Sequence, residues 1–345
     1  MTFQPQTLAV DVGFGNTKGV WGVTNAPDAP PSWRDVCFKS VAPQVRSKDE
    51  IELNKLNRFP INVGGQKYWV GPDAYSTGVE SGVIEQSVKN IKTPEYLALV
   101  AGAWAYMIKD LNVPIQSIET LVLGLPISAF KANREELAKL GRHVMTVPLD
   151  AQMAAQWNKT DLTVVAKNCI VLPQPYGGFV TASQNNPQLA ADGRSTLVLD
   201  PGYSTLDWFL VENGQPRIEQ CDSFEGGMST LLSDLAAQIS SDHGCGSPSF
   251  GLLETSLKRN DIVVSRKRIS MVDYLPSLKR SADVIISEFL RRFDPEKYGV
   301  TDIVLTGGSA PYFEQSIANA LPAYPIHTTP SSVMANARGF YLAAS

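Results

Sequence analysis

The sequence predicts an α/β fold built from two similar domains. Segments with the apolar pattern of strands alternate along the chain with segments typical of helices, which is the arrangement of an α/β protein. A short glycine-rich pattern also occurs twice, once in each half of the chain. With 345 residues, 43% of them hydrophobic and 19% charged, the chain is long enough to bury the cores of two medium-sized domains.

The first copy of the glycine-rich pattern is AVDVGFGNTKGVW, at residues 9–21. Strand-like segments lie on both sides of its turn. A dinucleotide-binding loop would open a helix and have the spacing GxGxxG, whereas Gly13, Gly15 and Gly19 give GxGxxxG. The P-loop pattern is also missing from this stretch. We therefore predict a β-hairpin made of residues 7–11, a tight turn and residues 17–23.

The second copy is TLVLDPGYSTLDWFLVENG, at residues 196–214. It again shows an apolar strand, an aspartate, a glycine turn and a second strand. Asp11-Val-Gly13-Phe14 aligns with Asp200-Pro-Gly202-Tyr203. A repeat of this length indicates two similar domains formed by duplication, because short-period solenoids repeat every 20–50 residues.

Further strand–helix pairs follow the same scheme. The segment TLVLGLPISAF predicts a strand and then a helix capped by Ser128 and ending near Gly141. Residues 168–182 and 302–321 each read as a strand that leads into a helix. Residues 96–108 form the longest apolar segment, which is too short to cross a bilayer and is predicted to be a buried helix.

The overall charge and the cysteines exclude several classes of function. The net charge of -4 gives no basic field that would attract nucleic acid directly. The four cysteines and three histidines are scattered, so a structural zinc or a disulfide framework is not expected. The N-terminus lacks the pattern of a secretory signal, and we expect a cytoplasmic protein that does not bind membranes.

The two hairpins carry candidate chemistry at their tips. Asp11 and Asp200 each end a strand before a glycine turn, a position from which a carboxylate can hold magnesium through its bound water. Lys18 adds a positive charge that would lie beside the phosphate groups of a bound ligand. Glycine lets backbone N–H groups approach phosphate oxygens closely, and the loop glycines are Gly13, Gly15 and Gly202. The alternative for either loop alone is a simple Asp-Gly hairpin turn, and the matched second copy favours a ligand site.

Taken in order, five segments resemble the nucleotide-pocket segments of the actin superfamily, which also includes sugar kinases and heat-shock chaperone ATPases. They are DVGFGNTK, LPQPYGGF, LDPGYSTLD, LTGGSAPYF and the closing SSVMANARGFYLA. The early GLPIS segment and the length most resemble the plasmid-segregation actins of the ParM/StbA group. The resemblance implies an actin-like fold of two duplicated, ribonuclease H-like mixed-sheet domains, with nucleotide in the interdomain cleft. It implies a first domain of residues 1–180, completed by a C-terminal helix at 331–345, and a second domain of residues 181–330.

The resemblance also implies roles for individual residues. The first phosphate loop would contain Asp11, Gly13, Asn16, Thr17 and Lys18. The second would contain Asp200, Gly202, Ser204 and Thr205. Gly307, Gly308 and Ser309 would lie against the nucleoside, and Gly226 and Gly227 would begin a helix on the nucleotide side of the second domain. For Gly226 and Gly227 the alternative is a helix start and nothing more.

Gln174 matches the position at which related filament ATPases carry a glutamine or glutamate near the attacking water. A glutamine cannot accept the proton as a general base, but it can orient the water, and phosphoryl transfer depends mainly on positioning and electrostatics. Slow hydrolysis would follow. The alternative is a glutamine in a surface turn.

Two helices are expected to cross closely, one after Tyr176 and one beginning near Ser332. Small residues four apart would face each other there. They are Gly178 and Ala182 on the first helix, and Ala335 and Gly339 on the second. Ordinary core packing is the alternative.

The leading hypothesis is a filament-forming nucleotidase that binds and hydrolyses ATP or GTP with Mg²⁺. Its partners would be further copies of itself and a DNA-binding adaptor protein, through which the filament would segregate plasmid DNA. The alternative is a small-molecule kinase of the same superfamily. A kinase needs a general-base carboxylate facing its acceptor, and the sequence shows no clear candidate near the phosphate loops. A chaperone ATPase is disfavoured, because no substrate-binding region follows the last motif.

Overall fold

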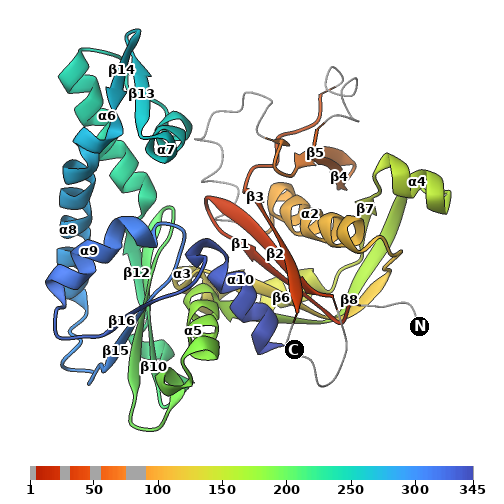
Figure 1. Cartoon of the computed structure of the whole chain (residues 1–345). Helices are drawn as coiled ribbons and strands as arrows, with labels where there is room; N and C mark the ends of the chain where they lie inside the picture. The colour runs from red at the N-terminus through yellow and green to blue at the C-terminus, as the bar shows by residue number, and fades with distance from the viewer. Residues whose placement is uncertain (1–4, 24–31, 47–55, 75–90, 345) are drawn as a thin grey trace. The chain divides into compact units, whose positions relative to one another are not determined.

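The computed structural model describes residues 5–23, 32–46, 56–74 and 91–344 of the chain. The chain divides into two compact units, one formed by Met1–Thr181 with Met334–Ser345 and the other by Ala182–Val333. Each unit is built on one mixed sheet with helices packed against it (Figure 1). The predicted α/β class is confirmed.

The sheet of the first unit has six strands in the order β3-β2-β1-β6-β8-β7. Strands β1, β2 and β3 are antiparallel neighbours, β6 and β8 extend the sheet parallel to β1, and β7 closes it antiparallel to β8. The strands are β1 (Thr7–Val12), β2 (Asn16–Gly22), β3 (Trp33–Lys39), β6 (Ser117–Leu125), β7 (Met145–Pro148) and β8 (Asp161–Pro173). A separate hairpin consists of β4 (Phe59–Val63) and β5 (Gln66–Val70).

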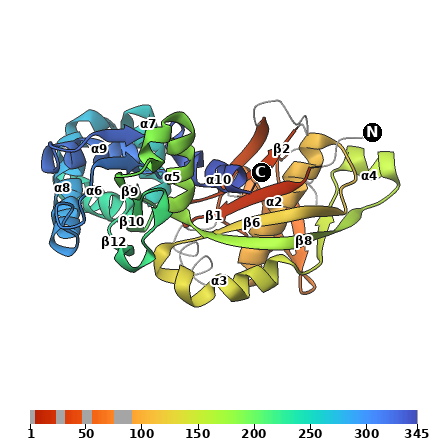
Figure 2. The same ribbon diagram turned by 90° about the horizontal axis from the view of Figure 1, so that it is seen from below.

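Two helices of the first unit, α2 and α3, pack on this sheet. Helix α2 contacts β1 and β2, and α3 contacts β6 and β8, as Figure 2 shows for α3. The helices are α2 (Pro94–Leu111), α3 (Ile127–Gly141), α4 (Ala151–Trp157), the start of α5 (Gln174–Asn185) and most of α10 (Ser332–Ala343). The apolar segment at residues 96–108 lies in α2, and all of its residues except Leu97 are buried, in agreement with the predicted buried helix. No helix among the described residues is apolar over enough length to span a membrane.

The sheet of the second unit has the order β11-β10-β9-β15-β16, and β12 also pairs with β10. Its strands are β9 (Ser195–Pro201), β10 (Thr205–Glu212), β11 (Gln215–Pro216), β12 (Asp222–Glu225), β15 (Asp302–Leu305) and β16 (Ile326–Thr328). Its helices are α6 (Met228–His243), α7 (Phe250–Arg259), α8 (Leu275–Arg292) and α9 (Ala310–Ala320), with a small hairpin of β13 (Asp261–Val264) and β14 (Lys267–Ser270). Three short 3₁₀ helices are η4 (Pro187–Ala190), η5 (Ile218–Gln220) and η6 (Met271–Tyr274).

The two sheets repeat one topology. In each unit an antiparallel hairpin, β1–β2 or β9–β10, is followed by strands that add parallel to its first member, β6 and β8 or β15 and β16. A further antiparallel strand, β3 or β12, pairs with the second member of the hairpin. The duplication predicted from the two glycine-rich segments is therefore confirmed.

The close crossing of α5 and α10 occurs at Gly177 and Gly339, within the first unit. A Cβ added to Gly339 would lie 1.8 Å from the Gly177 carbonyl oxygen, and one added to Gly177 would lie 2.2 Å from the Asn336 carbonyl oxygen. Thr181 Oγ1 donates to the Ala335 carbonyl 2.7 Å away. The prediction of small residues on both helices holds for Gly339, but the contact on α5 is made by Gly177 and not by Gly178.

One predicted helix cap is wrong. Helix α3 begins at Ile127, its cap position is Pro126, and no side chain caps it. Ser128 lies inside the first turn. Proline fixes its own backbone angle and so starts the helix without a capping hydroxyl.

We expect Gly339→Ala to lower the free energy of unfolding by about 3 kcal/mol, because a Cβ cannot fit between two touching backbones and the helices must separate. Thermal unfolding of the variant checks this. Gly246→Ala is the matched control, since a Cβ there meets no atom within 4 Å. Equal unfolding midpoints for the two variants would contradict the close contact.

Candidate functional site

The tip of the first hairpin holds a buried polar cluster around Asp11. In the register of β1 and β2, Asp11 lies opposite Lys18, and Lys18 Nζ is 2.8 Å from Asp11 Oδ2. Gln174 Nε2 donates to Asp11 Oδ1 across 2.6 Å. The Asp11 side chain is 1% exposed. Three residues predicted for the site, from three different elements, therefore meet at one carboxylate.

Gln174 is placed by the direct continuation of β8 into α5. The strand ends at Pro173 and the helix begins at Gln174, with no loop between them. The side chain is buried and its amide is held by Asp11. The alternative that Gln174 is a surface-turn residue is therefore wrong.

The turn of the first hairpin is held by Ser40, which the sequence did not point to. Ser40 is fully buried, its Oγ lies 2.6 Å from the Gly13 carbonyl, which accepts, and its N–H donates to the Gly15 carbonyl. The Thr17 hydroxyl lies 2.9 Å from the same Oγ. Ser40 directly follows β3, in the proline-rich stretch that shows no clear pattern, so only its neighbours in space reveal its role.

The backbone N–H of the first glycine in each loop makes a hydrogen bond within the hairpin turn. The N–H of Gly13 donates to the Asn16 carbonyl at 3.1 Å, and the N–H of Gly202 donates to the Thr205 carbonyl at 2.8 Å. In this conformation these two amides form the hairpins and do not point toward a ligand. The same bond in both copies is a second sign of the duplication.

The tip of the second hairpin carries two carboxyl groups. In the register of β9 and β10, Asp200 lies opposite Asp207, which is the position that Lys18 has in the first copy. Both side chains are buried, and Asp207 Oδ1 has no hydrogen-bond partner among the described residues. Burial, reinforced by the neighbouring Asp200, raises the pKa of Asp207 to about 8. Asp207 was not predicted, although LDPGYSTLD contains it.

Two other predicted segments pack on the second loop. The Gly202 carbonyl accepts bonds from Ser309 Oγ at 2.9 Å and from the Met228 N–H at 3.0 Å. The Gly226 N–H donates to the Ser204 carbonyl at 3.1 Å. A Cβ on Gly227 would lie within 2.7 Å of the carbonyl oxygens of the loop. Gly226 and Gly227 thus directly precede α6, with Gly227 at its cap position, and allow the helix to approach the loop.

Gly307 lies directly against Asp200. Its φ of +90° is a conformation that side chains disfavour, and a Cβ there would lie 2.1 Å from Asp200 Oδ1. Gly308 instead faces Val333, whose Cγ2 would be 3.7 Å from a Cβ on Gly308. The turn before α9 therefore reaches the second loop through Gly307 and Ser309.

The donor sets of the two loops suit different ligands. Both Asp11 oxygens are already paired with Lys18 and Gln174, so Asp11 does not fit a direct metal ligand in this conformation. Asp200 and Asp207 place an unpartnered carboxyl oxygen beside a second carboxyl group, a set that fits a divalent cation. No group of three or more His, Cys, Asp or Glu residues among those described could hold a metal, whereas Mg²⁺ commonly takes one or two carboxylates.

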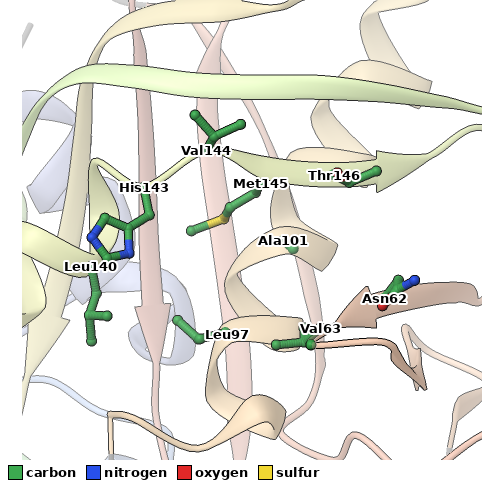
Figure 3. A pocket seen from close by; sticks show the side chains of 10 residues that line it. Asn62, Val63, Leu97, Ala101, Leu140, His143, Val144, Met145 and Thr146 are labelled. Carbon is green, nitrogen blue, oxygen red and sulfur yellow. The ribbon is translucent and has the colours of Figure 1, made fainter.

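The first unit also has a pocket of about 400 Å³ away from these residues. It lies between α2, the β4–β5 turn, the end of α3 and β7, and Figure 3 shows the apolar side chains of Leu97, Leu140 and Met145 around it. None of the predicted site residues lines it. We therefore assign a candidate site to each of the two loops, one in each unit.

We expect the stability of the protein to depend on the charge of Asp207. Its native pKa, about 8, lies above the ordinary 3.8, so the native state binds a proton that the unfolded chain releases between these values. The stabilisation is therefore complete below pH 3.8 and is lost as the pH rises to 8. Relative to Asp207→Asn, the free energy of unfolding of the wild type should fall by up to about 1.4 kcal/mol per pH unit.

Urea unfolding at pH 5, 6, 7 and 8 measures this difference. Asp192→Asn, which changes an exposed aspartate that does not act on Asp207, is the control and should follow the wild type. Parallel curves for wild type and Asp207→Asn would show that Asp207 is charged in the native state.

Two family models match the chain, one in each unit. A family model described as actin-like proteins, N-terminal domain, matches residues 9–177. A model described as archaeal actin homologue MreB-like, C-terminal, matches residues 198–319. The two matches follow each other along the chain and take in both hairpins. No curated protein sequence matches the chain.

Solved structures share the whole fold at low sequence identity. The archaeal actin homologue Ta0583 is 20% identical with a TM-score of 0.75, and its complex with ADP is 20% identical with a TM-score of 0.73. A ParM filament of 15 strands from Clostridium botulinum is 18% identical with a TM-score of 0.72. Each of these alignments covers 98% of both chains. With the family models on both units and the repeated acid-tipped hairpins, these findings show that the chain belongs to the actin superfamily.

Proposed function

We propose that the protein is a nucleotidase that binds ATP or GTP with Mg²⁺ and assembles into filaments. The observation that carries this proposal is the pair of hairpins with the same register and the same turn bond, each tipped by a buried aspartate. An ADP complex of a structural relative and a ParM filament structure support nucleotide binding and self-association.

Each loop would contribute a different part of the chemistry. In the first, Lys18 would place its charge beside the phosphates, with Gly15, Asn16 and Thr17 forming the loop backbone. In the second, Asp200 and Asp207 would hold Mg²⁺ with its bound water, and the ion would neutralise charge on the phosphates. The remaining residues proposed to contact the nucleotide are Ser204, Thr205, Gly226, Gly227, Gly307, Gly308 and Ser309.

Gln174 would orient the water that attacks the terminal phosphate. Its amide nitrogen is held by Asp11, which leaves the amide oxygen as the acceptor for that water. Asp11 would then act through Gln174 as a positioning residue. Without a general base in this position, hydrolysis would be slow.

For the kinase alternative, the structure offers one candidate general base, Asp207, but this side chain is buried. Asp207 is a carboxyl beside a phosphate loop, with the raised pKa that a base requires. However, the side chain is buried among β10, Ser223 and Thr205, so an acceptor substrate has no access to it. This placement favours the hydrolase over the kinase.

The ParM likeness further suggests that the filament segregates plasmid DNA. The net charge of -4 favours an indirect link, in which a DNA-binding adaptor protein joins filament and DNA.

We expect the purified protein to sediment at high speed with Mg²⁺ and a non-hydrolysable ATP or GTP analogue, and to remain in the supernatant without nucleotide. The reason is that the proposed filament assembles from subunits that have a nucleoside triphosphate bound. High-speed pelleting across a concentration series measures this. Turnover that rises only with an added metabolite, without sedimentation at any concentration, would favour the kinase instead.

Replacing the proposed magnesium ligand should remove turnover. We expect Asp200→Ala to lower Mg²⁺-dependent nucleotide hydrolysis by at least about 100-fold, since several kcal/mol of charge stabilisation would be lost. Phosphate release measures it, and circular dichroism checks the fold. Asp192→Asn is the control, and wild-type turnover in Asp200→Ala would refute the assignment.

A further inference from the structure

A buried arginine in the first unit has no counter-ion among the residues that the structure describes. Arg58 directly precedes β4, and its side chain is 8% exposed. Its Nε and Nη1 atoms are sealed from solvent and have no hydrogen-bond partner, and the described residues provide no carboxylate for it. Asp73, which lies in the neighbouring segment, accepts the backbone N–H of Asn57 at 2.7 Å.

A second unpartnered donor lies beside the guanidinium. Trp69 on β5 is 1% exposed, and its indole Nε1 also has no partner. Arg58 Cζ lies 4.0 Å from the centre of the Trp69 ring, so the guanidinium stacks on the indole. Pro60 lies opposite Trp69 in the register of β4 and β5, and Arg58 lies two residues before Pro60. The backbone therefore places the guanidinium on the same face of the hairpin as the indole.

The three buried atoms in this cluster without a partner, Nε and Nη1 of Arg58 and Nε1 of Trp69, are all hydrogen-bond donors, and the guanidinium is also a cation. Native proteins pair buried charges, because an uncompensated one is costly to remove from water. Stacking on an indole offsets only part of that cost. Nη2 is the one guanidinium nitrogen that is not among the sealed atoms, and it takes part in both hydrogen-bonding edges of the group. An acceptor bound at Nη2 therefore lies next to Nε or Nη1 on the same edge of the group.

We propose that Arg58 and Trp69 form a binding site for one small oxyanion, a carboxylate or phosphate group. The guanidinium supplies the charge and up to two donors, and the indole N–H supplies a further donor. The planar guanidinium matches both carboxylate and phosphate geometry. The site is separate from the loops at Asp11 and Asp200 and does not depend on nucleotide hydrolysis.

The test compares thermal unfolding in sodium chloride, sodium acetate and sodium phosphate at equal ionic strength and pH. The wild-type midpoint should rise saturably with acetate, phosphate or both, and Arg58→Met should lose this rise. Arg134→Met is the matched control, because Arg134 also lies over an aromatic ring, Phe130 at 5.9 Å, but is exposed. It should respond as the wild type does. General salt effects and phosphate bound elsewhere act on all three proteins and cancel.

A rise with phosphate alone, or with acetate alone, identifies which oxyanion the site takes and supports the proposal. An equal rise in Arg58→Met and the wild type, or no saturable rise in the wild type, overturns it. If Arg58→Met does not fold, Trp69→Phe decides, since it keeps a ring under the guanidinium and removes only the indole donor. Its half-saturating anion concentration should be about five- to tenfold higher, and an unchanged value overturns the site.

Discussion

The register of the two hairpins is the constraint on which the candidate site depends. Each aspartate ends a strand, and antiparallel pairing places a residue seven positions later directly opposite it. In the first copy that residue is Lys18, which neutralises Asp11 in a buried ion pair. In the second it is Asp207, which adds a carboxyl group to Asp200. The same backbone arrangement thus produces a neutralised carboxylate in one unit and an acidic pair in the other, and this divergence gives the two loops different donor sets.

The parts of the fold that are encoded locally could be predicted from the sequence. Both hairpins, the buried helix α2 and the strand–helix pairs follow from apolar periodicity and glycine turns, which neighbouring residues fix. The segment 33–70 could not be predicted in this way. Strand β3 is an edge strand in which only Phe38 is buried, and β4 and β5 form a separate small hairpin, so their apolar patterns are weak.

The candidate site was predictable to a similar degree and for the same reason. Motif residues such as Asp11, Gln174 and Gly307 lie where strands end, and the structure brings Asp11 together with Gln174 and Gly307 together with Asp200. The roles of Ser40 and Asp207 depend on pairing with distant or cross-strand partners, which no local pattern shows. The crossing glycine was misplaced by one residue, because adjacent glycines at 177 and 178 look alike until the facing helix is known.

The contact of Gly177 with Gly339 has a consequence for substitution at both positions. It is made by backbone atoms alone, so it carries no reactive group and no preference for any ligand. Even so, the smallest mutation from glycine closes the space that the two helices share. Any side chain at either position would force the helices apart, so the constraint on these positions is one of space and does not depend on any ligand.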